Sequence, residues 1–236
     1  MENFSLDIHD RELVTIVGPS GCGKSTLLNI LAGLYPPSVG EVLFEGRPIR
    51  GLNPEIGYVT QQDNLLPWRT LQKNVLLPLE FRGEAAANGA AERVRALIAK
   101  VGLAGFENHY PHELSGGMRQ RANIIRTLVY NPRVILMDEP FGPLDAQTRL
   151  TLQNQLLELW QEERKTIIFI THDLTEAISL ADRVVVMTGR PGGIKSVTPV
   201  RIPRPRDVYH IHQSEVYREV YDKLWEELRA EVAKVM

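Results

Sequence analysis

Nine residues near the start of the chain have the types and spacing of a phosphate-binding loop. They read Gly-Pro-Ser-Gly-Cys-Gly-Lys-Ser-Thr and match the pattern G-x-x-x-x-G-K-[ST] in full. Glycines let successive backbone N–H groups point at phosphate oxygens, Lys24 can reach the β- and γ-phosphates, and Ser25 can offer its hydroxyl to Mg²⁺. The pattern therefore predicts a binding site for ATP whose contacts come from Gly18, Ser20, Gly21, Cys22, Gly23, Lys24, Ser25 and Thr26.

Two apolar runs further along the chain each end in residues suited to phosphate hydrolysis. Asp138 and Glu139 follow the run 134–137, and His172 follows the run Thr166–Ile170. A carboxylate at the end of a buried strand beside such a loop can hold Mg²⁺, directly or through water, and this role is expected of Asp138. Glu139 is expected to be the general base for an attacking water, a role that contributes about 10²- to 10⁴-fold. His172 is expected to reach the γ-phosphate as a donor or an orienting group.

These residues need strands to present them, and the hydrophobic pattern predicts such strands. Leu13–Val17 is apolar and β-branched, as a buried parallel strand should be, and a helix is expected over 27–32. Strands then alternate with helices, which predicts a mostly parallel α/β sheet. The other expected strands are 4–8, half-buried by its alternation, and 40–46, 56–60, 134–137, Thr166–Ile170 and Arg183–Met187. The other expected helices are Leu71–Phe81, 91–101, one opening after the loop 112–118, 147–163 and one from about Ser214.

The composition narrows the classes of protein. The 236 residues carry a formal net charge of −2 and no Lys/Arg run, so nucleic acid is not expected as a partner. No apolar run approaches the roughly 18 to 20 residues that cross a bilayer, and the first residues do not read as a secretory signal. The single cysteine excludes an internal disulfide and favours a reducing cytosol, and scattered histidines give no zinc site.

A second glycine-containing loop resembles the motif of one particular protein family. Residues 114–118, Leu-Ser-Gly-Gly-Met, resemble the LSGGQ signature of the ATP-binding subunits of ABC transporters, with Met118 in place of glutamine. Gln61 resembles the family's Q-loop glutamine, Asp145 its D-loop aspartate, and His172 its switch histidine. The motifs occur in the family's order, and the resemblance spans nearly the whole chain.

The resemblance implies the fold: a RecA-like P-loop NTPase core with a mostly parallel sheet, a small antiparallel β part and an inserted α-helical subdomain. Within a single ABC ATPase domain at 1–236, the catalytic core is expected at 1–64 and 130–202. The helical subdomain is expected at 65–129, and a C-terminal helical tail at 203–236.

The resemblance also implies how the chain works. Two copies would pair head to tail and depend on ATP to do so, each ATP lying between the phosphate loop of one copy and the signature turn of the other. Glu139, His172 and Gln61 would be catalytic, and Mg²⁺ would be held by Ser25, Gln61 and Asp138. The contacts from the signature side would come from Ser115, Gly116, Gly117 and Asp145.

Several segments further resemble the nitrate/sulfonate/taurine importer group, a pattern shared by importers of thiamine-pathway pyrimidines. They are 65–70, 115–121, 190–194 and 203–206. This implies a peripheral subunit on the cytoplasmic face of the membrane that powers a separate permease, with a solute-binding protein as an indirect partner. The apolar group 65–68 would form part of the groove that receives a permease helix, or would be an ordinary buried loop.

Other interpretations stay open at this point. A soluble ABC ATPase acting on nucleic acid or ribosomes is the alternative function, although the coiled-coil insertions and basic surfaces of that class are not visible. Cys22 is either a reactive thiol or a small residue at a tolerant position. The stripe at 216, 220, 224, 228 and 232 either packs on the core or binds a partner. By the resemblance, an aromatic side chain from a strand upstream of the phosphate loop would stack on adenine. Phe4 is the only aromatic residue before Gly18, so weak recognition of adenine is expected. A start codon placed too late would equally explain why that upstream aromatic residue is missing.

Overall fold

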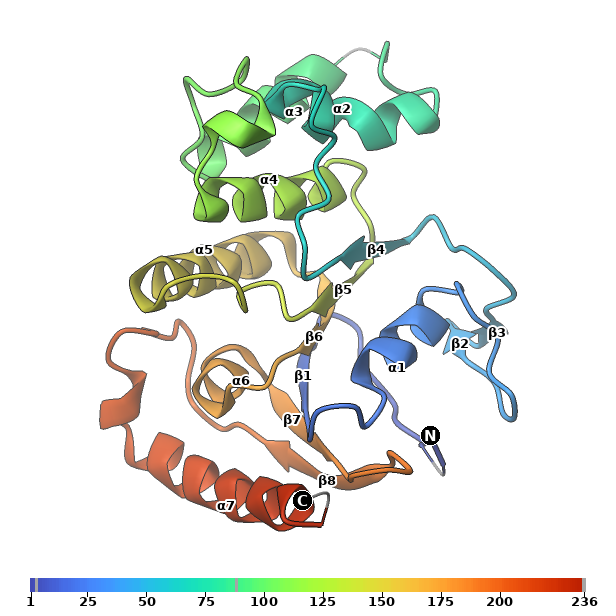
Figure 1. The fold of residues 1–236 in the computed structure, drawn as a ribbon, viewed down its shortest axis with the longest axis vertical. Coiled ribbons are helices and arrows are strands. Elements are labelled where there is room, and N and C mark those ends of the chain that lie inside the picture. The colour runs from blue at the N-terminus through green and yellow to red at the C-terminus, as the bar shows by residue number, and fades with distance from the viewer. Residues whose placement is uncertain (3, 88, 235–236) are drawn as a thin grey trace.

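A six-stranded sheet lies at the centre of the computed structural model, which describes residues 1–2, 4–87 and 89–234. Five neighbouring strands run parallel, and the last runs antiparallel to its neighbour (Figure 1). In spatial order they are β4 (Ile56–Val59), β5 (Val134–Asp138), β6 (Thr166–Ile170), β1 (Leu13–Val17), β7 (Arg183–Met187) and β8 (Ile194–Pro199). A separate two-stranded antiparallel sheet pairs β2 (Leu43–Phe44) with β3 (Arg47–Pro48). The expected fold class, mostly parallel with a small antiparallel part, is confirmed.

The position of β1 decides where the chemistry gathers. It lies between β6 and β7, with Leu13 opposite Ile167 and Val14 opposite Arg183. Parallel strands end at the same edge of a sheet, and ligands of such sheets bind beyond that edge. The residues that follow β1, β4, β5, β6 and β7 therefore share one edge.

Each face of the sheet has its own apolar cluster because alternate residues of a strand point to opposite faces. Val14 and Ile16 pack with Leu28 of helix α1 (Lys24–Leu31) on one face. Leu13 and Val17 belong to the larger cluster on the other face, which also contains residues of α5 (Ala146–Glu163) and α6 (Leu174–Leu180).

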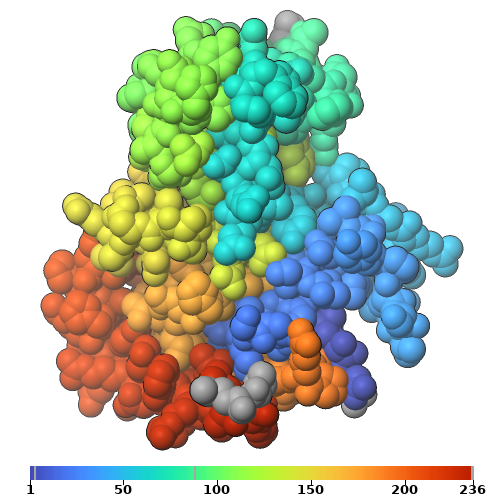
Figure 2. Space-filling view, in the orientation of Figure 1, coloured from blue at the N-terminus to red at the C-terminus, as the bar shows by residue number. Residues whose placement is uncertain are grey.

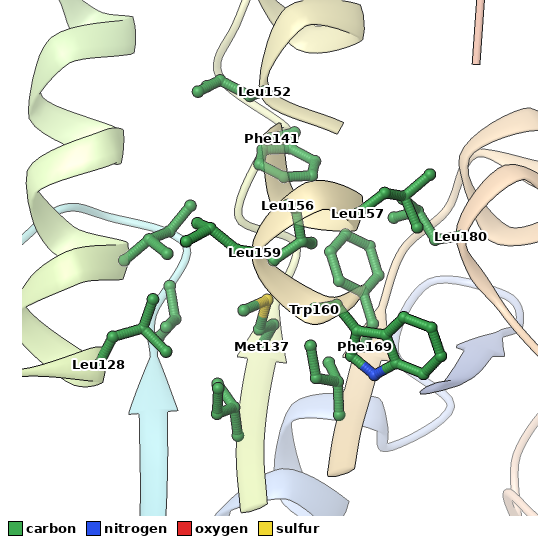
Figure 3. Close-up of a cluster of buried hydrophobic side chains, with 14 of the residues drawn as sticks. Leu128, Met137, Phe141, Leu152, Leu156, Leu157, Leu159, Trp160, Phe169 and Leu180 are labelled. Atoms are coloured by element: carbon green, nitrogen blue, oxygen red, sulfur yellow. The ribbon is translucent and has the colours of Figure 1, made fainter. Parts of the chain in front are cut away.

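The aromatic rings of Phe141, Trp160 and Phe169 lie among leucine side chains in the larger cluster between the sheet and α5 (Figure 3). The rings of Phe141 and Phe169 lie 5.6 Å apart between centroids. The indole N–H of Trp160 donates to the carbonyl oxygen of Lys165 at 2.8 Å, so this large buried ring leaves no unpaired polar atom. This bond ties the end of α5 to the residue that precedes β6.

Three helices form a layer beyond β4, and the cyan-to-green segment that contains them is the upper part of the molecule in Figure 2. They are α2 (Leu71–Phe81), α3 (Ala90–Lys100) and α4 (Gly116–Leu128), with a short 3₁₀ turn at Pro111–Glu113. Their buried residues belong to the same cluster as those of α5. A methyl group on Gly57 would come within 2.5 Å of the Thr127 side chain, so β4 and α4 approach too closely for any larger residue.

The C-terminal helix α7 (Glu215–Val232) follows a 3₁₀ turn at Ile211–Gln213 and packs on the larger cluster. Its buried side is formed by Tyr217, Leu224 and Glu231, with Val220 and Leu228 half-buried. The expected packing on the core holds, but Val232 at the end of the predicted stripe is 39% exposed. A repeat of four residues drifts around a helix of 3.6 residues per turn, so the end of such a stripe leaves the contact.

The predicted strand at 4–8 is wrong, and the prediction missed two strands and one helix. Phe4, Leu6 and Ile8 are half-buried against the α1-side cluster, as the alternation suggested, but no ladder is formed. Alternation shows which side chains face a core, and not whether a strand edge is within reach. The missed elements are β3, α6 and β8. Among the described residues, no helix combines the length and apolarity needed to span a membrane.

Candidate active site

The loop between β1 and α1 presents backbone N–H groups at the shared edge of the sheet. Gly23 occupies the N-cap position of α1 with φ 110°, a left-handed conformation that favours glycine, and no side chain caps the helix. The first amides of α1 are therefore available to an anion. This is the geometry expected of a loop that cradles phosphates.

Lys24 lies inside this loop and is 8% exposed. Its Nζ donates to the carbonyl oxygens of Gly18 at 2.8 Å and Pro19 at 3.1 Å. These two carbonyl oxygens hold the ammonium group inside the loop. Cys22 is buried in the cluster below the loop at 3% exposure, so the structure favours a small space-filling residue over a reactive thiol.

Asp138 ends β5 beside the loop. Burial raises the pKa of its carboxyl above the usual range, the hydrogen bond with Ser25 opposes that rise, and the neighbouring Glu139 adds to it. A bound cation would lower the free-energy cost of ionising this buried carboxyl. The hydroxyl of Ser25 and the carboxylate of Asp138 are also the oxygen ligands that Mg²⁺ prefers, so these residues fit the ion.

Glu139 and His172 meet at the ends of adjacent strands. The Nδ1 atom of His172 lies 2.8 Å from Oε2 of Glu139. Glu139 has φ 43°, an uncommon left-handed conformation for a residue with a side chain, and its N–H donates to the carbonyl oxygen of Ile170 at 3.0 Å. Strained residues of this kind cluster at functional sites. A cavity of about 10 Å³, close to the volume that one water requires, is lined by both side chains.

Gln61 follows β4 and approaches the same group from the other side. A methyl group on Gly142 would lie 3.5 Å from its Nε2 and 3.9 Å from Oε2 of Glu139, so amide and carboxylate flank Gly142. Helix α4 holds the segment that carries Gln61. Asn123 donates to Thr60 O at 3.1 Å, Arg126 to Asp63 O at 2.6 Å, and Arg119 pairs with the Asp63 carboxylate at 3.1 Å.

The signature turn lies apart from the phosphate loop. The N-terminus of α4 stands beside the start of α5 in Figure 1, well away from α1. Ser115 caps α4 by accepting a hydrogen bond from the N–H of Met118 at 3.3 Å, and Asp145 caps α5 by accepting one from Thr148. Ser115 and Gly116 are exposed, whereas Gly117 is buried, and a methyl group there would come within 2.6 Å of Thr148. The predicted residues therefore form two separate groups within one chain.

The sequence reasoning missed residues that connect these two groups. Arg149 in α5 pairs with Asp173 at 3.3 Å and donates to the carbonyl oxygen of Leu144 at 3.1 Å. Glu176 in α6 is 4% exposed and accepts a hydrogen bond from Gln153 of α5 at 3.0 Å. Burial raises its pKa to about 7. A glutamate three residues beyond the N-cap Asp173 is common in the first turn of a helix, so no local pattern marked it.

Comparisons with known proteins agree with this geometry. A family described as "ABC transporter" matches residues 1–142. An uncharacterized ABC transporter ATP-binding protein of Methanocaldococcus jannaschii is 48% identical over 228 residues, covering 97% of this chain and 85% of the relative. An aliphatic sulfonates import ATP-binding protein of Bacillus cereus is 41% identical over 224 residues, covering 95% of this chain and 86% of the relative.

Solved structures agree as well. The dimeric structure of a post-hydrolysis state of an ATP-binding cassette bound to ADP and Pi superposes with a TM-score of 0.73 at 36% identity, covering 85% of this chain and 90% of that chain. That neighbour shares the RecA-like cassette fold. Because the family match spans more than half of the chain and the relatives match nearly all of it, the chain belongs to the ABC transporter family as an ATP-binding cassette of the ATPase type.

Proposed function

We propose that this chain is the ATPase subunit of an importer and that it powers the uptake of a small solute through a separate permease. The observation that carries the hydrolytic part is the 2.8 Å contact between His172 and Glu139 at the edge that also holds the phosphate loop. The import direction is supported by the 41% identity with the aliphatic sulfonates import protein. The proposed solute class is nitrate, sulfonate or taurine, or a thiamine-pathway pyrimidine.

ATP binds with its phosphates in the loop 18–26. The backbone amides from Ser20 to Thr26 surround the phosphate oxygens, and Lys24 exchanges its two carbonyl partners for oxygens of the β- and γ-phosphates. The exchange costs little because the ammonium group already lies inside the ring of amides.

Mg²⁺ has suitable ligands in Ser25, Asp138 and the amide oxygen of Gln61. When bound, the ion neutralises charge that develops on the phosphate oxygens during transfer. Asp138 would gain from the ion, because burial raises the pKa of its carboxyl and a bound cation would favour the ionised form.

Glu139 then removes a proton from a water that lies against the γ-phosphate. The water oxygen forms a bond to the γ-phosphorus, the bond from that phosphorus to the bridging oxygen breaks, and ADP leaves with the bridging oxygen. His172 orients the Glu139 carboxylate through their hydrogen bond, and its other ring nitrogen is free to face the γ-phosphate.

The second half of each site comes from a second copy of the chain, paired head to tail. Ser115 and Gly116 are exposed at the N-terminus of a helix of 13 residues, which is a favourable place for an anion. Asp145 lies beside this turn in the same surface region, at the N-cap of α5. ATP is then the link between the two copies, and its hydrolysis shifts the population toward the open pair.

The helical layer transmits this change to the permease. We propose that residues 65–129 act as a unit, coupled to Gln61 through the bonds from α4 to the segment 60–64. Trp68, at 71% exposure, offers the permease an apolar contact, whereas Leu65 is buried in the core at 7%. The assembly places the chain at the cytoplasmic face of the membrane, with a solute-binding protein as an indirect partner.

The E139Q variant tests the hydrolytic part. Glutamine keeps the shape of the side chain but cannot take the proton, so we expect kcat for ATP to fall by about 10²- to 10⁴-fold while ATP still binds. Light scattering should show an ATP-dependent dimer that persists. The matched control is E219Q, at an exposed position of α7, which should behave as the parent chain. ATP hydrolysis by E139Q at the parental rate would refute the role of Glu139.

The transport part needs the complete assembly. The chain is reconstituted in vesicles with the permease and solute-binding protein that co-purify with it, and ATP hydrolysis is measured with an aliphatic sulfonate, taurine, nitrate or a thiamine-pathway pyrimidine. Stimulation by one of these with uptake of the same solute supports the proposal. Stimulation by ribosomes or nucleic acid, with none by any solute, would favour a soluble ATPase instead.

A further inference from the structure

The turn between β7 and β8 forms an additional wall of the phosphate loop. Nε of Arg190 donates to the carbonyl oxygen of Gly21 at 2.8 Å. A methyl group on Gly192 would come within 2.0 Å of the carbonyl oxygen of Cys22, so the two backbones touch. In Figure 2 the orange segment around this turn lies beside the blue N-terminal part of the chain. The turn is therefore part of the site's architecture.

The C-terminal helix braces this turn from behind. Glu231 is 2% exposed and accepts a hydrogen bond from the N–H of Gly189 at 3.2 Å. Its carboxylate also pairs with Lys195 at 2.9 Å and Lys234 at 2.6 Å. A braced turn holds the backbone of Arg190 at a fixed distance from the loop.

A cavity of about 450 Å³ opens between the turn and the start of α1. It is lined by Gly21, Cys22, Gly23, Thr26, Arg190 and Gly192, among others. The side chain of Arg190 is exposed. Its Nε is bonded to Gly21, and its two terminal nitrogens have no hydrogen-bond partner among the described residues, so they are available to a ligand.

The strand order says which end of the nucleotide reaches this cavity. β5 and β6, which present Glu139 and His172, lie on one side of β1, and β7 lies on the other side. The γ-phosphate must face Glu139 for hydrolysis to occur. A nucleotide that crosses the loop in this direction leaves its nucleoside on the β7 side, where Arg190 lies.

We propose that Arg190 binds the nucleoside end of ATP, with its guanidinium plane against the base and its N–H groups toward the ribose. This inference rests on the proposed function. A planar, always charged guanidinium suits this task, because it stacks on aromatic faces and donates several hydrogen bonds at once. Stacking does not read the edge of the base, so Arg190 contributes to the affinity for ATP and GTP alike.

The test compares ATP with inorganic tripolyphosphate, which has the phosphates and no nucleoside. Binding of each, with Mg²⁺, is measured by calorimetry for the parent chain and for R190A. We expect R190A to bind ATP roughly 5- to 30-fold more weakly and tripolyphosphate with parental affinity. R190K should also weaken ATP binding, because an ammonium group has no plane to stack.

Two further variants separate this role from a merely structural one. G192A forces the turn away from Cys22 and should weaken ATP and tripolyphosphate together, whereas R201A, at an exposed position beyond β8, should weaken neither. If R190A weakens both ligands equally, as G192A does, or weakens neither, the proposal is overturned. A parent chain that binds neither ligand would refute the proposed function itself, and the inference with it.

Discussion

The phosphate edge of the sheet and the signature turn are built in opposite ways. At the sheet edge, Lys24, Glu139 and His172 come from three separate parts of the sequence and converge, with His172 in contact with Glu139 at 2.8 Å. At the signature turn, Ser115 and Gly116 are neighbours in sequence and are exposed at a helix start that lies against α5 and its loop. The first group has its chemical partners within the chain, and the second does not.

This difference indicates what each group needs in order to work. In the proposed function the sheet edge binds phosphate as a single chain, because Lys24 already lies in the loop and the N-terminus of α1 is not capped by a side chain. Among the residues that the structure describes, the backbone amides of Gly116 and Gly117 have no hydrogen-bond partner, and in the proposed function they meet the phosphates held by a second copy. Arg149 and Glu176 join the two groups, since both link α5 to the segment after His172.

The largest expected effect comes from removing the charge inside the loop. Lys24→Met keeps the length and apolar volume of a buried side chain but removes two charge-assisted bonds to phosphate. We expect the affinity of the isolated chain for ATP to fall roughly 10²- to 10⁴-fold. Equilibrium binding of a fluorescent ATP analogue measures it, with K73M at an exposed position of α2 as the control. Parental affinity in K24M would mean that the sheet edge does not bind phosphate in this way.

A smaller and more selective effect is expected at the signature turn. Ser115→Asp keeps a good N-cap for α4 and adds a negative charge, which should repel the γ-phosphate held by the other copy. We expect the isolated chain to bind ATP as the parent does, while ATP hydrolysis falls roughly 30- to 100-fold. Ser115→Asn is the matched neutral variant, since asparagine caps equally well. Equal activity of the two variants would show that the turn does not face phosphate, and the contrast between the two groups would fail.

The smallest effect is expected at Glu176, whose hydrogen bond with Gln153 joins α6 to α5. The pKa of Glu176 is raised to about 7 by burial, and Asp173 nearby adds to the rise, while Thr171, Gln153 and Arg149 oppose it. The folded chain thus keeps a proton that the unfolded chain releases above about pH 4.5. Stability contributed by this proton is present at low pH and is lost as the pH rises toward 7.

Glu176→Gln removes that loss, because the neutral amide still accepts the hydrogen bond from Gln153. At pH 8 the variant should be more stable than the parent by on the order of 2 kcal/mol, and at pH 5 nearly equal to it. Urea unfolding at the two pH values measures the free energy of unfolding. The same difference between the two proteins at both pH values would show that Glu176 does not hold a proton in the folded chain.

Much of this protein could be read from local patterns, since those patterns describe contacts within a few residues. The loop 18–26 is one turn between a strand and a helix, so its fixed spacing already implies its geometry, and the fully buried β1 follows from its apolar residues. The alternation of Phe4, Leu6 and Ile8 with polar residues also predicted that these side chains are half-buried. It did not predict that this segment lacks a partner strand. That depends on which strand edge lies nearby, and only the folded chain provides it.

Long-range packing decided the rest. The contact between Glu139 and His172 joins residues that are 33 positions apart, and the bond from Arg190 to Gly21 joins residues 169 positions apart. No periodicity extends over such distances, and an exposed arginine in a turn has no local signature. The parallel register of the sheet brings these side chains to one edge, because every strand of that kind ends there.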